Sequence, residues 1–329
     1  MPAKFLINPI AGSGGGSRNW KRLREACTRL GYIEEKDYSF EWTCQSQATE
    51  QARRAAGTWQ RVLAVGGDGT VRQVAEGLIK AGTGAVLGVI PQGTGNDFSR
   101  TIGIYHYWRK ACLTAIEPVI KWLMTAPAAP VDVLVANDEL LFLSYCSIGF
   151  DAQVARAYER IRHHPKMRAV LRGRVMNECT YAVLGLKYCR TRLPELRICL
   201  DTAQTGWKEI GIHGGTCTLI VSNVSSYAGG ARIVEGNCYN DGQFNVTIIS
   251  HLRPFILLIV SRLWPRLRQA STLPSWGAQG MCLPLPRGCA VQVDGDDCTE
   301  SLARYSTLSI RVAGQIPVVL GPRTSELDF

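Results

Sequence analysis

The sequence predicts two domains, an α/β domain with a parallel sheet followed by a mainly antiparallel β domain. Residues 1 to about 125 alternate strand-like and helix-like patterns, whereas strand-like runs separated by turns rich in Asn, Asp and Gly dominate the rest. The segment APAAP at 126–130 lies between them and is typical of a linker. We therefore expect one domain over 1–126 and a second over 127–329, with the last strand as a candidate to pack back on the first domain.

In the first domain, apolar runs bounded by glycine or polar residues indicate the strands, and apolar residues at helical spacing indicate the helices between them. The expected order is a strand at 4–8, a helix around 20–30, a strand near 40, a helix at 48–56, a strand at 61–65, a helix after 70 and a strand at 86–90. This alternation of strand and helix is typical of a parallel sheet covered by helices.

In the second domain, short apolar runs between turns indicate strands at 131–135, 140–145, 196–200, 216–221, 244–249, 290–293 and 308–312. Two longer segments, 152–189 and 251–268, have helical patterns. The second combines a dense apolar face with four arginines. Such a segment lies at a membrane interface or packs as a helix on the β domain, and both interpretations stay open.

Charge and cysteine usage narrow the class of protein. The chain of 329 residues carries a formal charge of +10, so nucleotides, nucleic acids and anionic lipids are candidate partners. It has no zinc-finger spacing, RNA-binding aromatic motif or long basic run, and we expect no nucleic-acid partner. The loose basic stretch at 160–174 is interpreted as a solvated helix face.

Twelve cysteines without a CxxC pair indicate reduced thiols. No apolar run reaches the roughly 20 residues of a membrane span.

The segment RVLAVGGDGT at 61–70 carries the strongest chemical signal. An apolar run ends in two glycines, Asp68 and a third glycine, and a helical apolar stripe follows. Glycines let backbone N–H groups approach a bulky anion, and a helix N-terminus favours phosphate. Asp68 adds a ligand for a cation, and Thr70 is the expected N-cap of the helix.

Two further glycine-rich turns repeat this pattern, NPIAGSGGGS at 8–17 and PQGTGNDF at 91–98, where Thr94, Asn96 and Asp97 cluster. Each follows a predicted strand. Because the carboxyl ends of parallel strands lie at one edge of a sheet, we expect the three turns to converge on one crevice.

Seven motifs in order along the chain then carry a resemblance to a known family. They are NPIAGSG, VGGDGTVRQVAEGL, IPQGTGNDFSR, SIGFDA, SNVSSYAGG, NDGQFNV and VQVDGDD. Together they resemble the diacylglycerol kinase catalytic family, which includes soluble bacterial diacylglycerol kinases and the sphingosine and ceramide kinases. The resemblance implies a Rossmann-like domain followed by an antiparallel β-sandwich, with ATP in the cleft and a lipid hydroxyl as acceptor. GGDGT alone is shared with NAD kinases.

The resemblance also implies roles for individual residues. Mg²⁺ would be held by Asp68, Asp97 and Asp132, directly or through water, and a second, structural Mg²⁺ by Asp241 with carbonyl groups near Cys238 and Gln243. The nucleotide would be bound by Asn8, Pro9, Ile10, Ala11, Gly12, Thr43, Gly66, Gly67, Asp68, Gly69, Thr70, Val71, Arg72, Gln73, Thr94 and Asn96.

The VDGD segment would act on the acceptor. The family has glutamate at the proposed general base, and this chain has Asp296, one methylene shorter. Alternation along a strand would direct Asp294 and Asp296 to the same face, so the division of labour between the two stays open. This segment also fits an ordinary hairpin, and Asp132 also fits a buried hydrogen-bonding role. Asn240 and Arg72 depart from the residues usual in the family.

The resemblance therefore implies an ATP- and Mg²⁺-dependent kinase of diacylglycerol, peripheral on the cytoplasmic membrane face and acting at a surface with anionic lipid. The alternatives are a kinase of a sphingoid base, ceramide or phosphatidylglycerol, a NAD kinase, and a non-catalytic lipid-binding regulator. A homodimer is an open arrangement.

Overall fold

The computed structural model describes residues 2–44, 47–164, 174–234, 239–262 and 273–322. The chain divides into two compact units, which we call unit 1 (Met1–Val131 and Gln315–Phe329) and unit 2 (Asp132–Gly314). The boundary expected from the sequence, between residues 126 and 127, precedes this division.

Unit 1 contains a parallel sheet in the order β2-β1-β3-β4-β18. Its strands are β1 (Ala3–Ile7), β2 (Tyr38–Trp42), β3 (Arg61–Gly66), β4 (Val86–Pro91) and the end of β18 (Thr307–Val319), where Val318 pairs with Leu87. The strand order reverses at β1, because β2 lies on one side of it and β3 on the other. Ligands bind at such a switch point in open α/β sheets.

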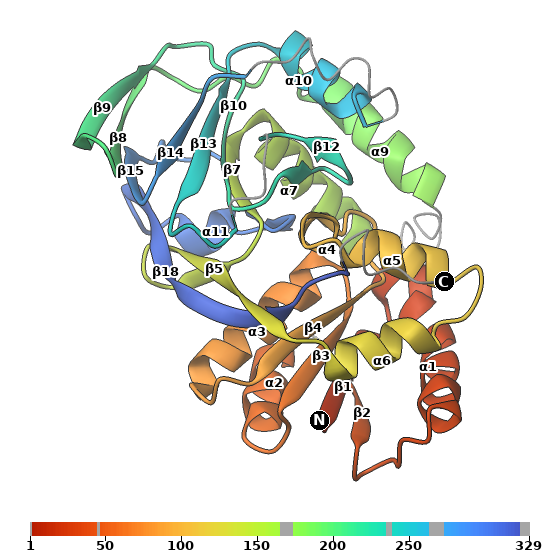
Figure 1. The fold of residues 1–329 in the computed structure, drawn as a ribbon. Helices are drawn as coiled ribbons and strands as arrows, with labels where there is room; N and C mark the ends of the chain where they lie inside the picture. The colour runs from red at the N-terminus through yellow and green to blue at the C-terminus, as the bar shows by residue number, and fades with distance from the viewer. Residues whose placement is uncertain (1, 45–46, 165–173, 235–238, 263–272, 323–329) are drawn as a thin grey trace. The chain divides into compact units, whose positions relative to one another are not determined.

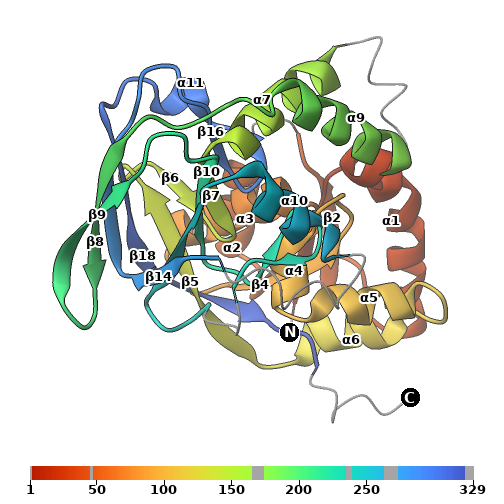
Figure 2. The ribbon, with the colours of Figure 1, turned by 90° about the horizontal axis from the view of Figure 1, so that it is seen from above.

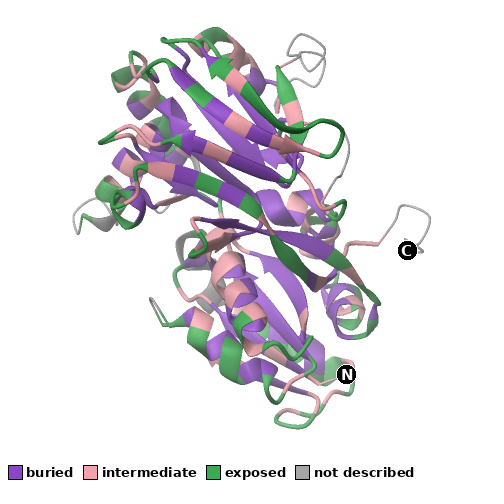
Figure 3. Cartoon of the chain, turned by 90° about the vertical axis from the view of Figure 1, so that its left-hand side faces the viewer, coloured by how far each residue is buried: buried purple, intermediate pink, exposed green. Residues whose placement is uncertain are grey.

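Helices cover both faces of this sheet (Figure 1). They are α1 (Ala11–Arg29), α2 (Ala48–Ala56), α3 (Asp68–Ala81), α4 (Asp97–Thr101), α5 (Ile104–Ala111) and α6 (Glu117–Thr125). Helices α2 and α3 pack together on one face, and α1 and α6 on the other. Every residue of β3 is buried, as Figure 3 shows for the strands of this sheet. The apolar run at 61–65 is therefore a central strand, as the pattern predicted.

The expected N-cap of α3 was wrong. The helix begins at Asp68, two residues before Thr70, with Gly67 at the N-cap in an extended conformation. Thr70 lies inside the first turn, where its hydroxyl accepts a hydrogen bond from Asn8 at 2.8 Å. The glycine pair lets the chain turn directly from strand to helix, so no hydroxyl cap is needed.

Unit 2 contains two groups of antiparallel strands. One sheet has the order β14-β13-β10-β7-β16-β17, and in the other β15 lies between β18 and β8, with β9 beyond. The bounds are β5 (Ala128–Ala136), β6 (Leu140–Phe142), β7 (Tyr145–Gly149), β8 (Leu196–Thr202), β9 (Gly206–Ile212), β10 (Thr218–Ser222), β11 (Ser226–Tyr227), β12 (Ala231–Arg232), β13 (Phe244–Ile249), β14 (Ser275–Ala278), β15 (Gly280–Pro284), β16 (Val291–Val293) and β17 (Asp296–Asp297).

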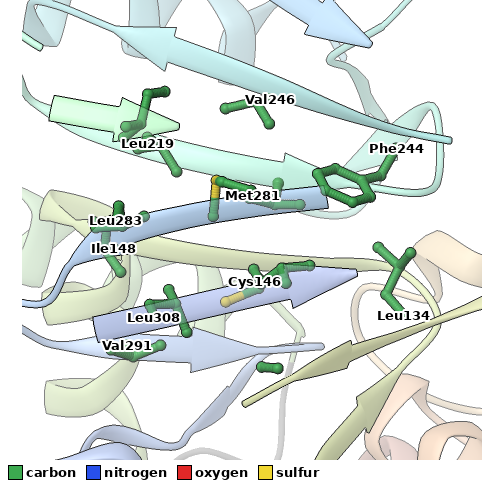
Figure 4. Close-up of a cluster of buried hydrophobic side chains, with 14 of the residues drawn as sticks. Leu134, Cys146, Ile148, Leu219, Phe244, Val246, Met281, Leu283, Val291 and Leu308 are labelled. Carbon is green, nitrogen blue, oxygen red and sulfur yellow. The ribbon is translucent and has the colours of Figure 1, made fainter. Parts of the chain in front are cut away.

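The core of unit 2 is formed by apolar side chains from both sheets (Figure 4). Ile148, Leu219 and Val246 come from the first sheet, and Met281 and Leu308 come from the second. Two sheets that bury apolar faces against each other form a β-sandwich. The predicted fold class, a Rossmann-like α/β domain with an antiparallel β-sandwich, is confirmed.

The helices of unit 2 are α7 (Phe150–His163), α9 (Arg174–Lys187), α10 (Leu252–Val260) and α11 (Thr299–Leu302). The first predicted helical segment corresponds to α7 and α9, and residues 165–173 lie outside the described residues. The second begins as α10, and its part from 263 lies outside them as well. Among the helices that the structure describes, none combines the length and apolarity required to cross a bilayer.

A buried arginine fastens β3 to the end of α6. Arg61 is 1% exposed and donates hydrogen bonds to the carbonyl groups of Leu123, at 2.8 Å, and Ala126, at 2.5 Å. These carbonyls lie at the carboxyl end of the helix, where its dipole favours a cation. Burial lowers the pKa of Arg61, and the two carbonyl groups offset part of the desolvation cost.

We expect Arg61→Met to lower the free energy of unfolding by about 2–4 kcal/mol, because it leaves buried carbonyls without their charged donor. Urea unfolding followed by circular dichroism measures the change. Arg54→Met is the matched control, since Arg54 is exposed and pairs only loosely with Glu41 at 3.7 Å. Equal unfolding midpoints for the two variants would contradict the role given to Arg61.

Candidate functional site

Three turns of unit 1 follow the carboxyl ends of neighbouring parallel strands. We call them the first turn (8–12, after β1), the second turn (66–70, at the end of β3) and the third turn (91–97, at the end of β4). Helices α1, α3 and α4 begin in or directly after these turns. Their N-terminal N–H groups have no partner within their own helix, which suits the binding of phosphate.

The turns contact each other through glycines. A Cβ atom on Gly93 would lie 2.5 Å from the Cα atom of Gly67, and one on Gly12 would lie 2.1 Å from the carbonyl oxygen of Gln92. Any side chain at these positions would force the backbones apart. The third turn therefore fits against both other turns only because Gly12, Gly67 and Gly93 lack side chains.

The carboxylate of Asp68 joins the second turn to the third. Its two oxygens accept the backbone N–H groups of Asp97, at 3.2 Å, and Phe98, at 3.1 Å. Asp68 thus contacts the first turn of α4 from outside that helix. The sequence predicted a chemical role for Asp68. The structure gives it a structural role as well, because its carboxylate holds the second and third turns together.

Two carboxylates lie beside Gly95. A Cβ atom on Gly95 would lie 3.2 Å from an oxygen of Asp68 and 3.3 Å from an oxygen of Asp97. Neighbouring carboxylates are stabilised by a cation, and oxygen ligands beside phosphate suit Mg²⁺. Across the described residues, no three His, Cys, Asp or Glu side chains gather into a metal-binding group. The acid pair fits an ion that keeps much of its water, and its coordination of Mg²⁺ stays a prediction.

Two asparagines shape the predicted nucleotide site. The side chain of Asn8 donates to Thr70 at 2.8 Å and accepts the N–H of Ile10 at 3.1 Å, so it ties the first turn to the second. Asn96, with a left-handed φ of 55°, accepts from Gly93 N–H at 2.8 Å and donates to its carbonyl group at 2.6 Å. The side chains of Asn8 and Asn96 therefore hold the backbone of the first and third turns in place.

The remaining predicted nucleotide residues lie on the same turns or beside them. Thr43 is buried, and its N–H donates to Ile7 at the end of β1 at 2.8 Å. Thr94 is exposed at the tip of the third turn. The others belong to the first and second turns or to the start of α1 or α3, namely Pro9, Ile10, Ala11, Gly66, Gly69, Val71, Arg72 and Gln73. Their contact with a nucleotide stays a prediction.

Arg100 supports the third turn and had no assigned role in the sequence. Its Nε donates to the carbonyl group of Gly95 at 3.0 Å, and its guanidinium lies 3.7 Å from the ring centroid of Tyr105. The bond fixes the glycine between Asp68 and Asp97. The sequence does not predict this contact, because Arg100 reaches Gly95 only when α4 folds the chain back toward the third turn.

Asp132 belongs to unit 2, where it is fully buried. Its carboxylate accepts the N–H of Gly242 at 2.8 Å, and its carbonyl group accepts from Asn223 at 2.8 Å. Asp241 accepts the N–H of Gln243 at 3.0 Å, a local turn contact. Cys238 lies outside the described residues. The hydrogen-bonding interpretation of Asp132 is therefore observed, whereas both predicted Mg²⁺ sites that involve these residues stay predictions.

The expectation that Asp294 and Asp296 alternate along one strand was wrong. Asp294 and Gly295, with φ of 49° and 88°, form the turn between β16 and β17. The carboxylate of Asp294 is 4% exposed and accepts three backbone N–H groups, from Leu143, Ser144 and Tyr145, at 2.9–3.1 Å. Left-handed backbone reverses the chain here, so the period of two does not apply.

Asp296, in contrast, is half-buried at the start of β17. Its neighbour Asp297 fixes this strand to α7. The N–H of Asp297 donates to Glu159 at 2.7 Å, and its carboxylate lies 3.5 Å from Arg156. Asp297 also accepts the N–H of Thr299 at 3.1 Å. The side chains of Glu159, Arg156 and Asp297 therefore hold the backbone that carries Asp296.

A second carboxylate in unit 2 gathers hydrogen bonds from several strands. Asp151, in the SIGFDA motif and 6% exposed, accepts from Ser147 at 2.5 Å, Tyr227 at 2.6 Å and Gln292 at 2.8 Å, and also from the Thr218 hydroxyl. All four donors are neutral. The motif was noticed in the sequence, but the partners of Asp151 come from four strands, β7, β10, β11 and β16, so spacing gives no sign of the cluster.

Cys146, which lies near these acids, has a thiol whose pKa is raised by burial. Cys146 on β7 is buried, and burial raises the pKa of its thiol well above 9.0, with smaller contributions from Cys298, Asp294 and Asp151. Burial likewise raises the pKa of Cys217 to about 11. A protonated thiol is a poor nucleophile, so neither cysteine is a candidate for nucleophilic chemistry.

Comparisons with known proteins agree with the geometry. The diacylglycerol kinase catalytic domain model matches residues 2–125, and the diacylglycerol kinase accessory domain model matches residues 141–297. The chain is 27% identical to a diacylglycerol kinase of Bacillus subtilis (strain 168) over 257 residues, 77% of this chain and 76% of the relative. It is 26% identical over 255 residues, 76% of this chain and 75% of the relative, to a Salmonella gallinarum protein named probable lipid kinase YegS.

Among solved structures, a diacylglycerol kinase from Bacillus anthracis str. Sterne superposes with a TM-score of 0.64. The match covers 98% of this chain and 97% of that one at 21% identity. At this identity the likeness shows a shared fold, and that fold runs through both units.

The contacts of the two aspartates predict different effects on stability. We expect Asp294→Asn to lower the free energy of unfolding by about 2–4 kcal/mol, because an amide has one acceptor oxygen where three buried N–H groups need two. Asp296→Asn should change it by less than about 1 kcal/mol. Urea unfolding measures both. Similar losses in the two variants would show that Asp294 is not the structural member of the pair.

Proposed function

Because the chain belongs to the diacylglycerol kinase catalytic family, we propose that it transfers the γ-phosphate of ATP to the hydroxyl of diacylglycerol, giving phosphatidic acid. The protein is a lipid kinase, a phosphotransferase with an alcohol acceptor. The diacylglycerol assignment rests on the accessory domain and on the relative that carries this activity in its name.

The observation that carries the proposal is the packing of three turns at the switch point of the unit 1 sheet. Gly12, Gly67 and Gly93 bring the turn backbones into contact, and Asp68 and Asp97 flank Gly95. Phosphoryl transfer is catalysed mainly by positioning and by neutralising charge. The N-termini of α1 and α3, which lack a side-chain cap, together with the two carboxylates supply the elements that a nucleotide with its cation requires.

Asp68 and Asp97 are the residues that would hold Mg²⁺ in this proposal. When bound, the ion neutralises charge on the phosphate oxygens. The carboxylate oxygens of Asp68 each accept one backbone N–H, from Asp97 at 3.2 Å and from Phe98 at 3.1 Å. These backbone contacts orient the carboxylate before any ligand arrives, which lowers the reorganisation cost of binding.

Asp296 is the proposed general base in the reaction. It would accept the proton of the attacking hydroxyl as the new O–P bond forms and the bond to the β-phosphate oxygen breaks. Asp294 does not fit this role, since its oxygens accept three buried N–H groups. The family glutamate is one methylene longer, and Asp297, Glu159 and Arg156 fix the strand that carries the shorter acid.

Incubation of the protein with ATP, Mg²⁺ and mixed lipids, followed by mass spectrometry, tests the substrate. We expect phosphatidic acid as the main product. Asp68→Asn should lower kcat by at least about 100-fold. Because the amide keeps only one of the two acceptor oxygens, some stability is lost as well, and circular dichroism at the assay temperature checks that the variant is folded. Asp37→Asn is the matched control, since Asp37 also accepts a backbone N–H, from Ile33 at 2.8 Å, but lies outside the three turns.

The lipid panel also identifies the competing activities. Phosphorylated ceramide, sphingoid base or phosphatidylglycerol in place of phosphatidic acid would replace the diacylglycerol assignment. Phosphorylation of NAD without any lipid product would indicate a NAD kinase. Lipid binding without turnover would indicate a regulator. Full activity of Asp68→Asn would remove the proposed role of the second turn.

Asp296 can be tested separately from the nucleotide site. Asp296→Asn should lower kcat by about 10²–10⁴-fold, the usual range for loss of a general base, with the affinity for ATP unchanged. Asp296→Glu restores the arm length of the family and should retain activity. Steady-state kinetics and calorimetric titration of ATP measure both properties. A kcat for Asp296→Asn close to that of the starting protein would mean that another group removes the proton.

A further inference from the structure

Helix α9 of unit 2 exposes a stripe of apolar side chains. Met176, Cys179, Val183 and Leu186 are exposed and are spaced by three, four and three residues, so they lie on one side of the helix. Val183 is 64% and Leu186 is 75% exposed. The same helix buries Leu184 on its other side. An amphipathic surface helix normally has one apolar face, and here the face directed outward is apolar as well.

Helix α10, whose place in unit 2 can be followed in Figures 1 and 2, also leaves an apolar side chain exposed. Its nine residues, LRPFILLIV, include Arg253 as the one charged residue, yet Leu258 is the one that is buried. Ile256 is 50% exposed. A helix of this composition is expected in a core or at a membrane surface rather than against water.

The two helices pack on one small core. Leu184 of α9 belongs to a cluster with Phe150 and Tyr158 of α7, and Leu252 and Phe255 of α10 pack against it. The ring of Phe255 meets that of Phe150 with centroids 5.2 Å apart. The exposed apolar residues thus lie on a supported surface within unit 2. We call Met176, Cys179, Val183, Leu186 and Ile256 the apolar face.

The two segments that carry the apolar face also carry an excess of positive charge. Residues 174–192 and 251–262 contain six cationic side chains and one acid. The cations are Arg174, Lys187, Arg190, Arg192, Arg253 and Arg262. The acid, Glu178, lies 3.7 Å from Arg262, which also donates to the carbonyl group of Ala228 at 3.1 Å. A surface with apolar side chains and excess cations complements anionic headgroups over an apolar layer.

We propose that the apolar face is the surface through which unit 2 docks on a bilayer that contains anionic lipid. The aliphatic side chains enter the headgroup boundary, and the exposed cations Lys187, Arg190 and Arg253 contact phosphate groups. A second copy of the chain is a poorer occupant, because it would bring the same excess of cations against this one. The proposal rests on the proposed function, since a lipid kinase must reach an acceptor that resides in a bilayer.

Vesicle sedimentation without ATP tests the proposal, so it does not depend on turnover. The double variant Val183→Glu/Ile256→Glu should bind vesicles of phosphatidylcholine and phosphatidylglycerol with a partition coefficient at least about tenfold lower, because each carboxylate opposes both insertion and anionic charge. Binding of the unaltered protein should weaken as NaCl rises and on vesicles of phosphatidylcholine alone.

Leu113→Glu is the matched control. Leu113 is 87% exposed, more than any member of the apolar face, and lies in unit 1 after α5. This variant should bind vesicles as the unaltered protein does. Thermal unfolding checks that all variants are folded. Equal binding by Val183→Glu/Ile256→Glu would overturn the proposal, as would a dimer that this variant dissociates while its vesicle binding is unchanged. Absence of lipid turnover with the expected vesicle binding would count against the proposed function alone.

Discussion

The contact between the carboxylate of Asp68 and the backbone N–H groups of Asp97 and Phe98 is the interaction on which the nucleotide side depends. It joins two turns that follow different strands, and it sets where α4 begins. The same carboxylate lies beside Asp97 at Gly95. One side chain therefore has a structural role and, in the proposed reaction, a chemical role as well.

The acids of unit 2 also differ in whether their carboxylates hold the protein backbone. Asp294 and Asp132 use their carboxylates to hold backbone of distant loops, and Asp151 gathers four neutral donors from separate strands. Buried carboxylates persist when their oxygens are satisfied in this way. Asp296 is the half-buried member of the DGD turn, and its backbone is the part that α7 fixes through Asp297. If Asp296 is the base, as proposed, the residues that support the turn and the residue that reacts are neighbouring but different.

The fold was largely predictable because its signals are local. The buried run at 61–65 and the glycine pair after it identify a central strand and a phosphate-type turn, and alternation along the chain predicts a parallel sheet. The β-sandwich was predicted from the order of the seven motifs, through the family resemblance that they carry. What the sequence could not give depends on tertiary contact. The left-handed turn at Asp294 and the bond from Arg100 to Gly95 arise from chain reversals that spacing alone does not record.

The described surfaces of the two units differ in a way that matches the two substrates of a lipid kinase. The nucleotide is soluble and highly charged, and unit 1 offers backbone N–H groups, polar turns and paired acids at its switch point. The acceptor lies in an apolar phase, and unit 2 exposes aliphatic side chains on α9 and α10 among cations. Exposed apolar area of this kind costs solubility in water, and a compensating gain arises only where another apolar phase covers it. In the proposed docking, a bilayer that carries both the acceptor and anionic headgroups covers the aliphatic side chains, pairs with the cations and supplies the substrate.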